Sequence, residues 1–171
     1  MKKWIEVSDA DKFKLWFDYP IKQLESIKGG HGGFCALMVA LPLYERFYRY
    51  AVSKGAPDNR PEWVKNDLLL KTTDEAKMFW QVFRDGLCHT GSFFEETRDY
   101  KKEDLPSISL DEKHSYSPKF LTREGIFIVE LNPWKFWKHV LDKYTSDPGV
   151  LDYAKAPLLP LHMLSAGVDK E

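Results

Sequence analysis

Two residues that could act on a phosphate lie five positions apart in this chain, at Arg84 and His89. An arginine side chain can hold a phosphate through its charge and its forked set of donors. A histidine can exchange protons near neutral pH. This pair is the minimal set of side chains for cleaving RNA without a metal ion. Asp85 follows the arginine directly and precedes the histidine by four positions, so on a helix it could orient the imidazole.

The spacing alone is weak evidence for a site. With six arginines and five histidines in 171 residues, the number of arginine–histidine pairs expected by chance with four to six residues between them is about 0.5. Over five residues a regular α-helix turns by about 500°, which would point Arg84 and His89 roughly 140° apart. The two could converge only if the helix unwinds near Gly86 or if a second copy of the chain supplies the other half. The alternative to a catalytic role is that Arg84 pairs with a carboxylate such as Asp85 or Glu75 and only stabilises the fold.

The pair lies at the end of the helix with the strongest pattern in the chain. Thr72 and Glu75 fit a capping box and predict its start. Gly86 and Gly91 predict that it loosens and stops near His89. A helix this apolar is typically central to a bundle or an interface. Its predicted buried face comprises Phe79, Val82, Phe83 and Leu87.

Similar patterns predict further elements. A first helix is expected to begin at Ser8 and to be interrupted at Pro20, and a second is expected over 34–53. Two more are expected to begin at Pro61 and at Asn132 with Pro133. β-branched and aromatic residues predict a strand over 125–131, with which 107–110 could pair. We expect a loop over 92–106 and a packed strap over 156–161. The predicted fold class is mainly α, a helical bundle with a possible small β-hairpin in the C-terminal half.

Composition limits the classes of function. The length fits one domain, and 43% hydrophobic with 30% charged residues indicates a globular chain. A formal net charge of −1 argues against coating nucleic acid by bulk charge, although a local basic site remains open. The two cysteines provide neither a disulfide framework nor a zinc-binding spacing. With no apolar run of ~20 residues and no signal-peptide pattern at the N-terminus, we expect a cytoplasmic protein without a membrane span.

The stretch from Phe83 to His89 resembles the motif of the HEPN superfamily, in which four to six residues separate an arginine from a histidine. The residue after the arginine is commonly Asn, Asp or His in that family, and Asp85 fits. The resemblance implies a single HEPN-like helical domain over 1–171, with the hairpin and the C-terminal helix as an extension outside the family pattern. It also implies a homodimer in which two motifs face each other. Many members are metal-independent endoribonucleases.

The resemblance further implies roles, partners and a mechanism. The 2′-OH of RNA would attack the adjacent phosphate, with no metal and no cofactor. His89 would act as general base or acid, Arg84 would stabilise the phosphate charge, and Asp85 would position His89. Some members are toxins or antiviral effectors beside a nucleotidyltransferase-like partner. The expected partners are therefore RNA, a second copy of the chain and such an antitoxin.

Other residues suggest how RNA could be held. Arg46 and Arg49 accompany Tyr48 on the helix over 34–53, and they combine charge with a stacking ring, as single-stranded RNA sites do. The alternative is an ordinary helix, with the tyrosines in its core and Glu45 and the arginines on its wetter side. For the whole protein, the alternative function is a non-catalytic module that binds RNA or a protein, anchored by Arg84 and His89.

Overall fold

The computed structural model describes residues 8–27, 32–87, 107–124 and 126–155. The predictions for Cys88, His89, 92–106 and 156–161 concern residues outside these ranges. Within them the chain is mainly helical, with a small three-stranded sheet in the C-terminal half, which confirms the predicted fold class. None of the described helices is long and apolar enough to cross a membrane.

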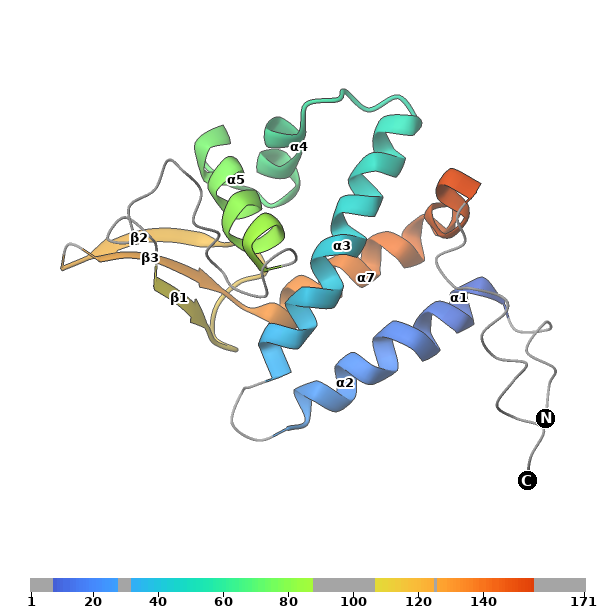
Figure 1. Cartoon of the computed structure of the whole chain (residues 1–171), viewed down its shortest axis with the longest axis horizontal. Helices are drawn as coiled ribbons and strands as arrows, with labels where there is room; N and C mark the ends of the chain where they lie inside the picture. The colour runs from blue at the N-terminus through green and yellow to red at the C-terminus, as the bar shows by residue number, and fades with distance from the viewer. Residues whose placement is uncertain (1–7, 28–31, 88–106, 125, 156–171) are drawn as a thin grey trace.

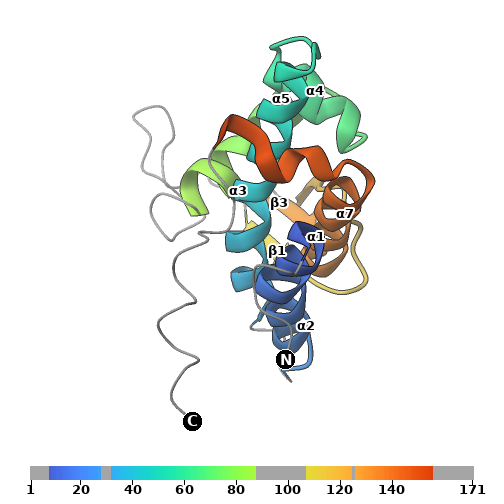
Figure 2. The ribbon, with the colours of Figure 1, turned by 90° about the vertical axis from the view of Figure 1, so that its right-hand side faces the viewer.

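The core forms where two long helices cross. α3 (Gly32–Ser53) packs against α7 (Pro133–Ser146), and the hydroxyl of Tyr144 donates to the carbonyl oxygen of Leu43 across the crossing, at 2.9 Å. The ring of Tyr44, which is fully buried, lies edge-on to Phe136, with 5.5 Å between the ring centroids. Figures 1 and 2 show the shorter helices at the two ends of this crossing, with α4 (Arg60–Asp67) and α5 (Thr73–Phe79) at one end.

Helix starts follow the capping residues that the sequence predicts. Ser8 accepts a hydrogen bond from the backbone N–H of Asp11 at the start of α1 (Asp9–Phe13). Thr72 and Glu75 form both bonds of the capping box of α5. The side chain of Asn132 accepts hydrogen bonds from two backbone N–H groups at the start of α7, at 3.0 and 2.9 Å. Each cap satisfies donors that the first turn of a helix would otherwise leave unpaired.

The predicted interruption at Pro20 is wrong. The chain stays helical from α1 through a π-helical segment, η2 (Lys14–Asp18), into α2 (Tyr19–Glu25). Pro20 lies in the first turn of α2, where proline is best tolerated. The wider π turn directly before it carries i→i+5 hydrogen bonds, so the backbone there does not depend on the N–H that proline lacks.

The sheet comprises β1 (Ser107–Leu110), β2 (Lys119–Arg123) and β3 (Ile126–Leu131) in the order β1-β3-β2. β1 pairs with β3, as the sequence predicts, and the two strands run parallel. The hairpin is formed by β2 and β3, which are antiparallel. The sequence analysis missed β2, which directly follows Pro118 and carries the charged residues Lys119 and Arg123 at its two ends.

A buried carboxylate ties α4 to the central crossing. Asp67 accepts hydrogen bonds from the hydroxyl of Tyr44 at 2.7 Å and from Nε2 of His139 at 2.8 Å, and it pairs with Lys143. Burial by itself would raise the pKa of Asp67, but these hydrogen bonds and the charge of Lys143 outweigh burial and lower it. The charged carboxylate therefore stabilises the packing of α4, on which one wall of the site described below is built.

We expect Asp67→Asn to lower the free energy of unfolding at neutral pH by about 3 kcal/mol, because it leaves Lys143 without its buried partner. The pKa of Asp67 is lower in the folded protein than the value of about 4 in the unfolded chain. The carboxylate therefore contributes its full stabilisation above about pH 4, and this contribution is lost as the pH falls through the pKa of the folded state. The difference in the free energy of unfolding between Asp67→Asn and the parent protein should therefore decrease below about pH 4. Denaturant unfolding across pH measures it.

Asp74→Asn provides the matched control, because its pair with Lys77 is exposed and should contribute almost nothing. Equal effects of the two substitutions would contradict the role assigned to Asp67.

Candidate functional site

Arg84 lies on a helix of unusual winding. α5 continues into η3 (Trp80–Leu87), a π-helix of eight residues in which each hydrogen bond spans five residues instead of four. Phe83 lies on the buried side of η3. It is fully buried, and its ring centroid lies 5.2 Å from that of Phe79. Segments of π-helix occur frequently at functional sites. His89, the proposed partner of Arg84, lies outside the described residues.

Two carboxylates hold the guanidinium of Arg84. Its Nε and Nη2 lie 2.7 and 2.6 Å from Oε2 of Glu45 on α3, and its Nη1 donates to Oδ1 of Asp85 at 3.0 Å. Burial alone would lower the pKa of Arg84, but the hydrogen bonds and charges of the two carboxylates raise it. Arg84 therefore carries its charge at every accessible pH, and its fork is held in one orientation.

Glu45 joins Arg84 to a second arginine. Its other oxygen, Oε1, accepts hydrogen bonds from Nε and Nη2 of Arg49, at 3.0 and 2.6 Å. The sequence pattern places Glu45 on the wetter side of its helix, but the residue is buried because Arg84 of η3 covers it. Burial would raise the pKa of Glu45, and the two arginines more than compensate and lower it. We call Glu45, Arg49, Arg84 and Asp85 the Arg84 cluster.

A pocket of about 450 Å³ opens on one side of the cluster, and we call it the Tyr48 pocket. Glu45 and Arg49 form part of its wall, and Arg49 is the exposed member of the pair, with 63% of its side chain accessible. Tyr48 contributes its ring and donates its hydroxyl to Asp58 at 2.6 Å. Burial and that hydrogen bond raise the pKa of Tyr48 to about 12, so the phenol stays neutral.

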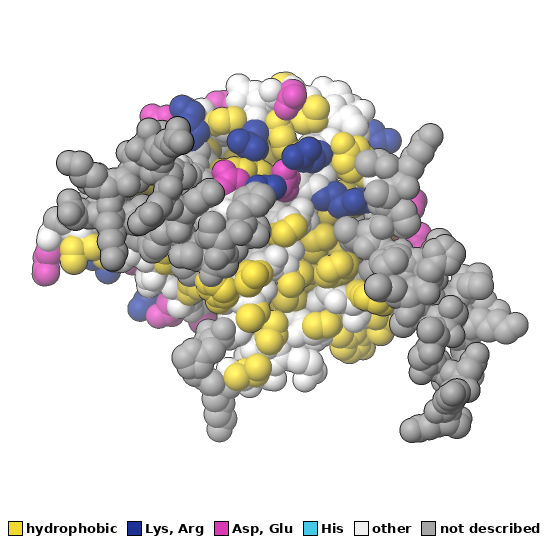
Figure 3. All heavy atoms as spheres, viewed as in Figure 1, with side chains coloured by type: hydrophobic (Ala, Val, Ile, Leu, Met, Phe, Trp, Pro, Cys, Tyr) yellow, Lys and Arg dark blue, Asp and Glu magenta, His cyan; other side chains and the backbone are white. Residues whose placement is uncertain are grey.

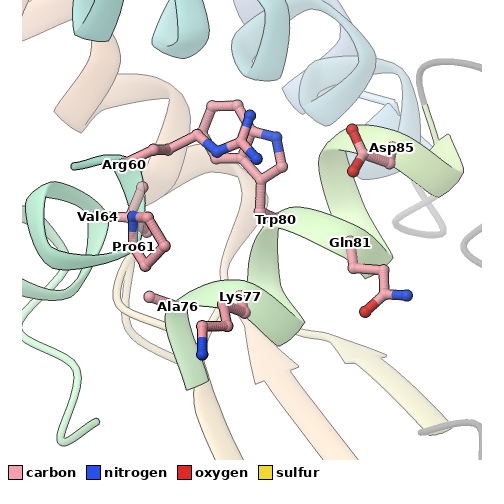
Figure 4. Close-up of a pocket in the computed structure, with 8 residues that line it drawn as sticks. All are labelled: Arg60, Pro61, Val64, Ala76, Lys77, Trp80, Gln81 and Asp85. Atoms are coloured by element: carbon pink, nitrogen blue, oxygen red, sulfur yellow. The ribbon is translucent and has the colours of Figure 1, made fainter. Parts of the chain in front are cut away.

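A second, smaller pocket of about 240 Å³ lies next to the cluster, and we call it the Trp80 pocket (Figure 4). Asp85 of the Arg84 cluster forms part of its wall. The two pockets share Arg60 and Pro61 from the start of α4. The remaining residues that line the Trp80 pocket are Val64, Ala76, Lys77, Trp80 and Gln81.

The surface around the cluster is mixed in charge. In the space-filling view of Figure 3, basic and acidic side chains lie close together over α3, α4 and α5, above a more apolar area. Within the Arg84 cluster two arginines face two carboxylates, so their formal charges cancel. The residues that the sequence analysis missed here are Glu45, Arg60 and Trp80, which come from three different elements.

The three residues predicted to bind substrate separate into two groups. Arg49 and Tyr48 both line the Tyr48 pocket. Arg46 instead donates hydrogen bonds to the carbonyl oxygens of Val150, Leu151 and Tyr153, at 3.3, 3.2 and 2.8 Å. These carbonyls belong to the 3-10 helix η5 (Pro148–Lys155). Arg46 thereby fixes η5 against α3, with Tyr153 as one wall of the Tyr48 pocket.

A second polar cluster lies in the sheet. Nε2 of His114 is 3.0 Å from the hydroxyl of Ser109, and Nδ1 is 3.5 Å from Oε2 of Glu130. The order resembles that of a nucleophile, a base and a carboxylate, but 3.5 Å is too long for a strong hydrogen bond. Arg123 also holds Glu130, at 2.7 Å. We therefore interpret this cluster as a tie between the strands and their loop.

The described residues contain no group of three or more histidines, cysteines, aspartates or glutamates placed to hold a metal ion. Comparison with known proteins found no matching family model, no matching curated protein and no matching solved structure. Function must therefore be argued from the Arg84 cluster and its two pockets.

We expect Arg46→Ala and Arg49→Ala to differ in stability. Arg46→Ala removes three hydrogen bonds to backbone carbonyls and should lower the free energy of unfolding by about 2 kcal/mol. Arg49→Ala removes an ion pair whose arginine is largely exposed and leaves Glu45 paired with Arg84, so it should lower the free energy of unfolding by less than about 1 kcal/mol. Chemical denaturation of both variants measures the difference, and a larger loss for Arg49→Ala would contradict the assignment.

Proposed function

We propose that this protein is a metal-independent endoribonuclease of the HEPN type. The observation that carries the proposal is the π-helical winding of η3 at Arg84. In a regular α-helix, residues five apart point in different directions, whereas i→i+5 hydrogen bonds bring such residues close to one face. The wide winding therefore favours pairing of Arg84 with a residue five positions further along the chain, which is the position of His89.

The reaction uses Arg84, His89 and no metal. The 2′-OH attacks the adjacent phosphorus while His89 accepts its proton, and the bond from phosphorus to the 5′ oxygen breaks. The imidazolium formed on His89 returns a proton to that oxygen, which leaves a 2′,3′-cyclic phosphate and a 5′-OH. Proton transfer by a positioned histidine contributes ~10²–10⁴-fold to the rate. Arg84 stabilises the charge on the phosphate, and Asp85, which already bonds Arg84, positions the imidazole.

RNA enters through the two pockets in this proposal. Arg49 and Arg60 supply positive charge, and Tyr48 and Tyr153 supply rings against which bases can stack. Phosphate binding at Arg84 has to compete with Glu45 and Asp85, which hold the guanidinium. Because the formal charges of the cluster cancel, we expect weak binding of RNA outside the transition state.

The proposed assembly is a homodimer in which two Arg84 clusters face a common cleft. A nucleotidyltransferase-like antitoxin is the proposed partner, and the cytoplasm is the proposed location. These proposals follow from the resemblance of the Arg84 to His89 motif to the HEPN superfamily.

A second candidate function is supported by the pairing of Arg84 itself. A guanidinium held by Glu45 at 2.6 Å and by Asp85 at 3.0 Å is also what a purely structural or partner-binding arginine requires. Glu75, the other carboxylate considered as a partner for Arg84, instead accepts hydrogen bonds from the backbone N–H groups of Lys71 and Thr72. The protein would then bind RNA or a protein partner and leave RNA intact.

In the presence of excess chelator, we expect the purified protein to cleave single-stranded RNA to products with 2′,3′-cyclic phosphate ends. His89→Ala should slow cleavage by about 100-fold or more, because it removes the proton carrier. Arg84→Lys should slow it by a similar factor, because it keeps the charge and loses the fork that reaches the phosphate. Gel analysis of end-labelled RNA and end-group analysis of the products measure both effects.

Lys54→Ala is the control variant, since Lys54 is exposed and lies over the ring of Tyr50, away from both pockets. Unchanged cleavage in both His89→Ala and Arg84→Lys would refute the nuclease. RNA that is bound and left intact by the parent protein would favour the second candidate.

A further inference from the structure

We propose that the Trp80 pocket binds a single nucleobase, guanine in preference to the others. This inference rests on the proposed action on RNA and names the part of the RNA that this pocket recognises. It depends on the size of the pocket, an unpartnered indole N–H, the planar side chain of Arg60 and the carboxylate of Asp85.

The shape of the pocket suits one flat ring system. Its volume of about 240 Å³ lies below the range for drug-sized ligands. Pro61, Val64 and Ala76 give it apolar walls, which would disfavour a phosphate and favour the face of a base. In Figure 4 these walls lie on one side of Trp80 and Asp85 lies on the other, while Arg60 reaches over the Trp80 ring, so polar groups are available at the edge of a bound ring.

The indole of Trp80 carries an unused donor. Trp80 is only 3% exposed, and its Nε1 is the buried side-chain polar atom for which the described residues provide no hydrogen-bond partner. Buried donors without a partner are rare in native proteins because each one costs free energy. The N–H edge of the indole is turned toward the side of the pocket where Asp85 lies (Figure 4). A ligand with an acceptor at its edge would satisfy this donor.

Arg60 provides a plane for stacking. Its guanidinium carbon lies 4.6 Å from the centroid of the Trp80 ring, and Arg60 forms no salt bridge among the described residues. Trp80 thus backs the guanidinium, whose side chain belongs to an exposed residue at the start of α4. Arginine planes backed in this way stack on bases in RNA complexes. A small movement of Arg60 would also open the N–H edge of the indole.

Asp85 selects the base. Its Oδ1 accepts from Arg84, while its second oxygen, Oδ2, has no hydrogen bond among the described residues. Guanine presents two neighbouring N–H donors, at N1 and N2, beside the acceptor O6. Asp85 would accept from the donors, and the Trp80 N–H would donate to O6. Because Asp85 also bonds Arg84, a base bound here would place its own phosphate near the Arg84 cluster.

The test observes the indole N–H directly. The six tryptophans give separate indole signals in a ¹⁵N–¹H spectrum, and Trp80→Phe identifies the signal of Trp80. Guanosine, adenosine, cytidine, uridine and inorganic phosphate are titrated in turn into the full chain. We expect guanosine to shift the Trp80 signal with saturation, and to bind at least about fivefold more tightly than the other nucleosides.

Arg60→Ala should weaken guanosine binding by about fivefold or more through loss of the stacking plane. Lys54→Ala, which removes a cation from the ring of Tyr50 at 5.5 Å, should leave binding unchanged. The five other indole signals report whether each variant is folded. The proposal is overturned if no nucleoside shifts the Trp80 signal, if all four bind alike, or if phosphate shifts it as guanosine does.

Nucleoside binding requires no cleavage, so the two proposals fail separately. Guanosine binding without RNA cleavage refutes the nuclease alone. Cleavage without guanosine binding refutes the base site alone.

Discussion

The buried carboxylate of Glu45 is the constraint on which the site depends. It lies on α3, the central helix, and holds Arg84 of η3 with one oxygen and Arg49 with the other. Removing Arg84 would leave the buried Glu45 with only the largely exposed Arg49, and removing Glu45 would leave two guanidinium groups close together. This interaction fixes η3, which lines the Trp80 pocket, against α3, which lines the Tyr48 pocket. The same interaction occupies the arginine that the proposed chemistry needs, so catalysis requires RNA phosphate to share or displace it.

The winding of η3 is the second constraint. π-helix is rare, and most π-helical segments are single turns within an α-helix. Here the wide winding covers the stretch that carries Trp80, Arg84 and Asp85. It is compatible with a packed core because Phe79 and Phe83 remain buried and in contact. The other π-helical segment, η2, precedes Pro20, where it has a local explanation. The first proline after η3 in the sequence is Pro106, far from its last turn, so the winding of η3 is better explained by the side chains that it places.

Local patterns predicted most of the fold. Caps at Ser8, Thr72 and Asn132 were recognisable because a polar side chain at a helix start needs only its nearest neighbours. The strand β3 was recognisable from its run of β-branched and aromatic residues, whereas β2 has charged residues at both ends and is held by its antiparallel pairing with β3. The prediction of an interruption at Pro20 was wrong because the wider turn of η2 precedes the proline. That turn depends on packing and not on local propensity.

The site was predictable only in part for the same reason. Arg84, Asp85, Arg49 and Tyr48 were found from residue type and spacing within one helix. Glu45, Arg60 and Trp80 acquire their roles from contacts between α3, α4 and η3, and spacing along the chain carries no signal for such contacts. Arg46 has the residue type of an RNA-binding residue, but it holds η5 through three backbone carbonyls.

The central claim is that Arg84 exchanges its carboxylate partners for an RNA phosphate opposite His89. The most direct measurement is a crystal structure of the protein with a short RNA whose 2′-OH is methylated, so that it binds and cannot react. We expect the guanidinium of Arg84 and the imidazole of His89 at hydrogen-bond distance, about 3 Å, from one phosphate. A complex in which Arg84 keeps both Glu45 and Asp85 while the phosphates lie elsewhere would contradict it.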